Sequence, residues 1–204
     1  MQIVYIHGLD SNANASKANQ LRTFCAKHFP QIEVVVPDLN CSPQLAIERI
    51  KAIIATNADT GLVGSSLGGF YATILSNMTG KKAVLLNPSV QSGESLKRFF
   101  GEDFDSLAED YVGHTTPDGW AITKKDIEWL VEHCPTQASY PERLLVIVKK
   151  GDELLDYQKA VDFFSQKDNQ SHLIIEEGGD HRMSDFETKL PQVVQFLFGL
   201  PMLK

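Results

Sequence analysis

A serine framed by glycines is the feature of this chain with the clearest chemical meaning. The run Gly64-Ser65-Ser66-Leu67-Gly68 follows a short apolar segment and precedes a helix-like one, and in this setting a Gly-x-Ser-x-Gly pattern predicts a nucleophile elbow. A serine at a sharp strand-to-helix turn needs residues without a Cβ two positions away on either side, as Gly64 and Gly68 are. The pattern therefore favours Ser66 as a nucleophile. Ser65 fits the glycine spacing less well, and an ordinary tight turn with an exposed serine is the alternative.

A serine nucleophile requires a base to take its proton and a carboxylate to orient that base. In this arrangement the acid and the histidine follow the serine along the chain, each after a strand. Asp152 comes after one apolar run, and His181 comes after a later one and a Gly-Gly turn. Because parallel strands end at one edge of a sheet, we expect the three side chains to meet there. Alternatively, Asp152 only caps a helix and Asp156 is the acid, or His181 is a surface histidine.

The amino-terminal segment predicts backbone donors for a developing negative charge. Residues 2–6 form an apolar run that leads into a loop containing Gly8. An oxyanion hole in this arrangement takes one N–H from the residue after the nucleophile, Leu67, and one from the loop after the first core strand. Gly8 allows a close approach of that loop, and we expect Leu9 to supply the second donor. His7 comes too early in the chain to be the base and is expected to hold its loop.

Together these blocks resemble the YqiA-like bacterial esterase family of the α/β-hydrolase superfamily, over nearly the whole chain. The likeness rests on the opening strand with His7 and Gly8, residues 63–73, Asn87 with Pro88, residues 151–157 and residues 176–181. The resemblance implies a small cytoplasmic carboxylic ester hydrolase for short acyl chains, with Ser66, Asp152 and His181 as its triad. The family pattern often has Asn where this chain has Asp180, which adds a negative charge beside the base.

Six apolar runs alternate with helix-like segments, which predicts an α/β fold. We expect a minimal α/β-hydrolase fold, with a mostly parallel six-stranded sheet and helices on both faces. The runs lie near residues 2–6, 33–36, 61–64, 82–86, 144–148 and 172–176. A single domain of residues 1–204 is expected, with a small helical cap inserted at about 89–140. The aromatic residues of that interval, which either cover the acyl pocket or only pack together, are Phe99, Phe100, Phe104, Tyr111, Trp120 and Trp129.

Composition and net charge restrict the kinds of partner that this chain is expected to bind. The net charge of −7 and the lack of a Lys/Arg cluster argue against a nucleic-acid binder. The first residues enter a core strand without a secretory leader, and no apolar stretch reaches the length of a membrane span. Three scattered cysteines fit a reducing compartment. We expect a cytoplasmic protein that binds a small acyl ester, with no nucleic-acid or membrane partner, while the oligomeric state stays open.

No cofactor is expected, and no metal. Asp180, His181 and Asp185 are close in sequence, but no second His or Cys stands at a metal-binding spacing. The same triad would serve a thioesterase, a carbon-carbon bond hydrolase or a peroxidase-like enzyme, because fold does not fix the substrate. A non-catalytic binding protein that kept the elbow is the remaining alternative.

Overall fold

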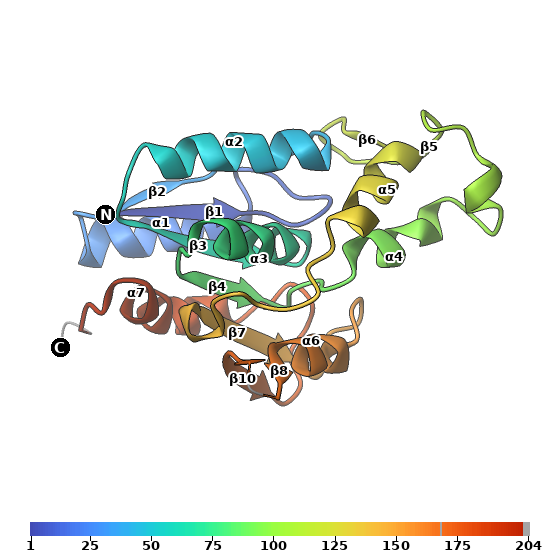
Figure 1. The fold of residues 1–204 in the computed structure, drawn as a ribbon. Coiled ribbons are helices and arrows are strands. Elements are labelled where there is room, and N and C mark those ends of the chain that lie inside the picture. Colours follow the sequence, from blue (N-terminus) through green and yellow to red (C-terminus); the bar gives the residue numbers. More distant parts are fainter. Residues whose placement is uncertain (168, 202–204) are drawn as a thin grey trace.

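One six-stranded sheet forms the centre of the molecule (Figure 1). The computed structural model describes residues 1–167 and 169–201, so residues 168 and 202–204 of the predicted 1–204 domain lie outside the described part. The strand order is β10-β7-β4-β3-β1-β2, and every pairing in this sheet is parallel. Its strands are β1 (Gln2–Ile6), β2 (Glu33–Val35), β3 (Thr60–Ser65), β4 (Ala83–Leu86), β7 (Leu144–Lys149) and β10 (His172–Glu176). The predicted sheet is therefore confirmed.

Helices cover both faces of the sheet, because alternate residues of each strand point to opposite sides. Val4 and Ile6 of β1 belong to one core with α2, α3 and α6, and Ile3 and Tyr5 belong to the other with α1 and α7. The helices are α1 (Ser16–His28), α2 (Pro43–Ala55), α3 (Leu67–Thr79), α4 (Ser92–Leu96), α5 (Lys124–Glu132), α6 (Tyr157–Phe164) and α7 (Leu190–Phe198). No helix within residues 1–167 and 169–201 has the length and apolarity that crossing a bilayer would require.

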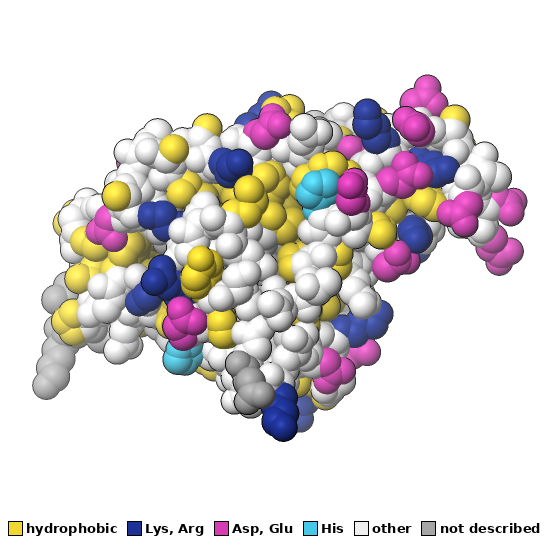
Figure 2. Space-filling view, in the orientation of Figure 1, with side chains coloured by type: hydrophobic (Ala, Val, Ile, Leu, Met, Phe, Trp, Pro, Cys, Tyr) yellow, Lys and Arg dark blue, Asp and Glu magenta, His cyan; other side chains and the backbone are white. Residues whose placement is uncertain are grey.

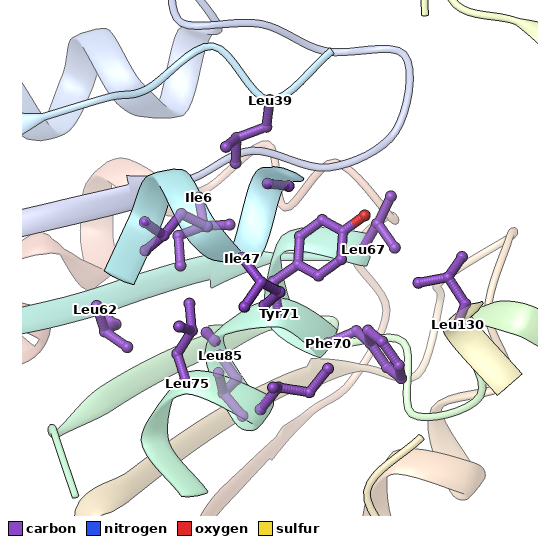
Figure 3. Close-up of a cluster of buried hydrophobic side chains, with 14 of the residues drawn as sticks. Ile6, Leu39, Ile47, Leu62, Leu67, Phe70, Tyr71, Leu75, Leu85 and Leu130 are labelled. Atoms are coloured by element: carbon purple, nitrogen blue, oxygen red, sulfur yellow. The ribbon is translucent and has the colours of Figure 1, made fainter. Parts of the chain in front are cut away.

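Helix α3 is the most enclosed helix of the first core. Its first ten residues, Leu67–Ser76, are all buried. In Figure 3, Leu67 and Tyr71 of α3 lie among side chains of the sheet, of α2 and of α5, including Leu130. A helix that is buried on every side is held by packing rather than by propensity. The turn that precedes α3 is therefore attached to a rigidly packed helix.

The interval between β4 and β7 leaves the sheet at the carboxyl ends of the strands and projects to the right in Figure 1. It contains α4 and α5, together with an antiparallel ribbon of β5 (Val112–Thr115) and β6 (Ala121–Thr123). The ribbon was not predicted, since strands of three or four residues are too short for a clear alternation. A second ribbon pairs β8 (Ser165–Gln166) with β9 (Asn169–Gln170).

Aromatic side chains anchor this projecting segment. Phe100, Phe104 and Trp120 are buried in the first core, and the rings of Phe100 and Phe104 meet edge to face at 5.4 Å. Tyr111, in contrast, is 46% exposed. The outer end of the segment is acidic, as the magenta side chains at the right of Figure 2 show. Contacts within the segment account for part of this burial, since the Phe100 ring lies against Gly113 and the Trp120 indole N–H faces the Asp126 carboxylate.

Candidate active site

Ser66 occupies a strained turn between β3 and α3. Its backbone has φ 55° and ψ −119°, in a region that residues with a side chain rarely adopt. A Cβ on Gly64 would overlap the backbone of Gly68, and a Cβ on Gly68 would overlap the carbonyl of Ile6. Both glycines are therefore required by contacts with backbone. The strand, turn and helix that the glycine spacing predicts are all present here.

A continuous chain of hydrogen bonds joins three side chains at this turn. The His181 Nε2 lies 3.0 Å from the Ser66 Oγ, and the His181 Nδ1 lies 2.9 and 2.8 Å from the two carboxylate oxygens of Asp152. Because a carboxylate only accepts, Nδ1 carries the proton and Nε2 accepts from the serine hydroxyl. The structure thus brings together the three residues that the sequence places far apart.

The Asp152 carboxylate is held by its own loop. Its side chain is 2% exposed, and its Oδ1 accepts hydrogen bonds from the N–H groups of Leu154 and Leu155 at 2.9 and 2.8 Å. Asp156, the alternative acid, instead caps α6 by accepting from the N–H of Gln158 at 2.9 Å. The carboxylate in contact with the imidazole therefore belongs to Asp152.

The loops after β7 and β10 touch one another directly. The Gly151 N–H donates to the carbonyl of Gly178 at 2.9 Å, and a Cβ on Gly151 would overlap the backbone of Gly179. In addition, Glu153 accepts a hydrogen bond from the His181 backbone N–H at 2.8 Å. Sequence reasoning missed Glu153, since a charged residue in a turn carries no signal of a partner 28 positions away.

The residue before the histidine is ionised. Asp180 accepts a hydrogen bond from the Ser184 N–H at 3.1 Å, and hydrogen bonds from Ser184 hold the pKa of the Asp180 carboxyl below its usual value. The extra negative charge inferred from the sequence at this position is thus present beside the base.

The loop after β1 lies against the nucleophile. A Cβ on Gly8 would stand 3.0 Å from the Ser65 carbonyl oxygen and 3.1 Å from the Ser66 Cβ, so a larger residue would have to push this loop or the turn at Ser66 slightly apart. Among the described residues, the N–H groups of Leu9 and Leu67 have no hydrogen-bond acceptor, and Leu67 is the first residue of α3. Both expected donors are thus free of protein acceptors, and their loops border the serine.

His7 joins two loops near this site, as the sequence led us to expect. Its Nδ1–H donates to the Gly8 carbonyl at 3.0 Å, and its Nε2 accepts from the Leu39 N–H at 3.1 Å. Burial lowers the pKa of the His7 imidazole, which keeps it neutral and able to accept that bond.

Polar side chains fasten the β5–β6 ribbon to the loop that carries Leu9. His114 Nε2 lies 2.8 Å from Asp10 Oδ1, and Asn12 Nδ2 donates to Asp118 Oδ2 at 3.0 Å. Sequence reasoning missed these pairs because the partners are more than 100 residues apart. The ribbon and the loop beside Ser66 are therefore linked.

Within the described part of the chain, no three His, Cys, Asp or Glu side chains are grouped closely enough to hold a metal ion. Asp185, one of the residues considered from the sequence, pairs with Lys149 at 2.6 Å. His181 is engaged by Ser66 and Asp152.

The arrangement of sheet, helices and loops is that of the α/β-hydrolase fold, and comparison with solved structures agrees. Est1E from Butyrivibrio proteoclasticus, in a structure with ferulic acid bound, superposes with a TM-score of 0.76 at 14% identity, covering 98% of this chain and 90% of that one. Mouse alpha/beta hydrolase domain-containing protein 10 gives 0.67 at 18% identity, with 93% and 85% covered. The Pyrococcus furiosus esterase Pf2001 gives 0.62 at 15%, with 95% and 80% covered.

Within this fold, the chain can be assigned to a family. A family model described as an uncharacterised protein family, UPF0227, matches residues 2–198, and the chain belongs to that family. It is the YqiA family, so the resemblance inferred from the sequence blocks is confirmed.

Proposed function

We propose that this protein is a serine esterase that hydrolyses short-chain carboxylic esters through an acyl-enzyme intermediate. The observation that carries the proposal is the hydrogen-bond chain from Ser66 through His181 to Asp152. A serine hydroxyl bonded to an imidazole, which is bonded in turn to a buried carboxylate, is the arrangement needed to activate a weak nucleophile. Solved structures with this fold include proteins called esterases, which supports the same reaction class.

In the proposed mechanism, His181 Nε2 takes the proton of Ser66 as the Oγ attacks the ester carbonyl carbon. Asp152 stabilises the imidazolium that forms. The N–H groups of Leu9 and Leu67 bind the oxyanion, and His181 then gives its proton to the departing alcohol. Water attacks the acyl-enzyme, again with His181 as base, and the carboxylic acid leaves as Ser66 regains its proton.

The proposed location is the cytoplasm. Its support is the family resemblance and the three cysteines, none of which is in a disulfide. Burial raises the pKa of the Cys25 thiol to about 11, so this thiol stays protonated and unreactive.

Steady-state kinetics on matched substrates tests the proposal. Purified protein is assayed with p-nitrophenyl acetate, butyrate and octanoate, and with a thioester and an anilide of the same acyl groups. We expect fastest turnover on the short esters, and a loss of roughly 10⁴-fold or more in Ser66→Ala, with Ser65→Ala as the control that stays active. A preference for the thioester would assign the site to a thioesterase. Equal ester turnover by the parent and Ser66→Ala would refute the proposal.

A further inference from the structure

Asn87, immediately after β4, has a backbone conformation and an environment unlike those of an ordinary loop asparagine. Its φ is 42°, in the left-handed region that Asn tolerates better than most residues. The residue is only 3% exposed. Its backbone N–H donates to the Ile147 carbonyl at 2.9 Å, so the turn is fixed to the neighbouring strand β7.

The side-chain amide of Asn87 joins the loops that carry the acid and the base. Its Nδ2 donates to the carbonyls of Asp180 and His181 at 3.0 and 3.1 Å, while its Oδ1 accepts from the Lys149 N–H at 2.8 Å. The reversed amide would turn its oxygen toward two carbonyls and its NH₂ toward an N–H, so only this orientation satisfies the partners. A carboxylate of the same shape could not replace it.

The residues beside Asn87 hold the serine as well. The Ser66 N–H donates to the Leu86 carbonyl at 3.0 Å, and the Ser66 carbonyl accepts from the Ser89 N–H at 3.1 Å. Residues 86–89 are therefore hydrogen-bonded both to the backbone of Ser66 and, through Asn87, to the backbone of His181. One short segment therefore fixes the backbone positions of both Ser66 and His181.

The loop before His181 needs such a support. Gly178 and Gly179 both have positive φ, 62° and 77°, and glycine leaves a loop with more conformational freedom to lose than any other residue. The two hydrogen bonds that Asn87 donates hold the backbone carbonyl groups of Asp180 and His181 in place. They restrict the rotation that would carry the imidazole away from Ser66.

We infer that Asn87 is a positioning residue that sets the His181 imidazole over the Ser66 hydroxyl. The inference rests on the proposed function for its kinetic consequence, but not for its structural one. An imidazole displaced by about 1 Å can cost on the order of 100-fold in rate. The Asn87 amide hydrogen-bonds to backbone groups of Lys149, Asp180 and His181, so it acts through the position of His181.

The test compares Asn87→Asp, which keeps the shape but cannot donate, with Asn87→Gly, which keeps access to positive φ and lacks the amide. We expect kcat on p-nitrophenyl acetate to fall by about 100-fold in both variants, with KM changed by less than about threefold. The second readout is the downfield proton resonance of the His181 Nδ1–H, assigned by its absence in His181→Ala. That signal is expected to broaden or vanish in both variants.

The matched control is Asn77→Asp. Asn77 donates to the Gln137 carbonyl at 2.9 Å and accepts from the Ser139 N–H at 2.7 Å, so it fixes a loop by the same chemistry at a distance from the three side chains. It should retain parental kcat and the resonance. A folded Asn87→Gly with both readouts unchanged would overturn the inference even if Asn87→Asp failed to fold. If the parent hydrolysed no ester, the proposed function would fail, whereas the resonance would still decide the role of Asn87.

Discussion

The Nε2 of His181 lies 3.0 Å from the Oγ of Ser66, although 115 residues separate them in the chain. This distance is within the range of a hydroxyl-to-imidazole hydrogen bond, and it arises from the convergence of two loops at the carboxyl edge of a parallel sheet. Each partner is fixed separately, Ser66 by the strained turn at the start of α3 and His181 by the loop after β10. The fold itself therefore holds the pair in position for catalysis.

The two candidate acids can be separated by substitution. Asp152→Asn should lower kcat by roughly 10³–10⁴-fold, because an amide cannot hold the imidazole in the required tautomer or stabilise its cation. Asp156→Asn is the matched control and should stay within about threefold of the parent, since asparagine caps a helix as well as aspartate does. Ester turnover by both variants is the measurement. High activity in Asp152→Asn together with a loss in Asp156→Asn would move the acid to Asp156.

Replacing an elbow glycine by alanine should destabilise the protein far more than replacing a glycine whose only special feature is a positive φ. Gly68→Ala is expected to prevent folding or to cost several kcal/mol, because its Cβ would overlap the Ile6 carbonyl within the core. Gly101, at φ 78° with open space around its Cβ position, is the control, and Gly101→Ala should cost about 1–2 kcal/mol. Urea unfolding measures both. Similar losses in the two variants would mean that the crowding at Gly68 is relieved by backbone movement.

Removal of the hydroxyl group should change the free energy of unfolding in opposite directions at two buried tyrosines. The Tyr71 hydroxyl is buried and has no hydrogen-bond partner among the described residues, and an unpaired buried donor costs about 1–3 kcal/mol. Tyr71→Phe should therefore raise the free energy of unfolding by about 1 kcal/mol. Tyr5, whose pKa is raised by burial and lowered in part by a hydrogen bond with the Ser65 side chain, is the comparison, and Tyr5→Phe should lower the free energy of unfolding by about 1 kcal/mol. A destabilised Tyr71→Phe would indicate a bound water or another partner for that hydroxyl.

Ion pairs of a buried lysine should account for part of the loss of folding stability at acid pH. Lys149, with a side chain 5% exposed, forms ion pairs with Glu176 and Asp185 at 2.5 and 2.6 Å. Burial alone would raise the pKa of both carboxyls, but the hydrogen bonds and charges of Lys149 and Lys189 together outweigh burial and lower each pKa. Groups with a lowered folded-state pKa stabilise the protein above their unfolded pKa, about 4, and lose that contribution as the pH falls through the folded-state value.

The loss of folding stability between pH 7 and about pH 3 should therefore be smaller in Lys149→Met than in the parent. The measurement is the free energy of unfolding in urea at pH 7 and near pH 3, compared between the parent and the variant. We expect a smaller difference between the two pH values in Lys149→Met, although the variant is less stable at pH 7 because the two partly buried carboxylates lose one of their two ammonium partners and keep only Lys189. Parallel pH profiles for the two proteins would contradict this assignment.

Much of the fold follows from local sequence signals. Apolar runs of four or five residues predict all six strands of the sheet. The signal is clearest for the four inner strands β1, β3, β4 and β7, because a parallel strand buried on both faces is apolar over most of its length. Ser66, Asp152 and His181 are predicted from their order after three such runs. That prediction uses only chain order and the rule that parallel strands end together, and it needs no knowledge of the side-chain contacts.

The contacts that position these side chains were not predictable in the same way. Glu153, Asp10 and His114 find their partners only through tertiary packing, so no spacing in the sequence marks them. Asn87 was noticed only as part of a block shared with a family, and its role depends on the direction of one amide. The β5–β6 ribbon was missed because its two short strands carry no period of their own.

The most direct test of the central claim is covalent labelling of Ser66 by a fluorophosphonate. Intact-mass measurement after incubation should show one adduct per chain, and peptide mapping should place it on Ser66. Ser66→Ala should remain unmodified, His181→Ala should react far more slowly, and Ser65→Ala should label like the parent. A parent protein that stays unlabelled, or one whose adduct forms equally well in Ser66→Ala, would contradict the account.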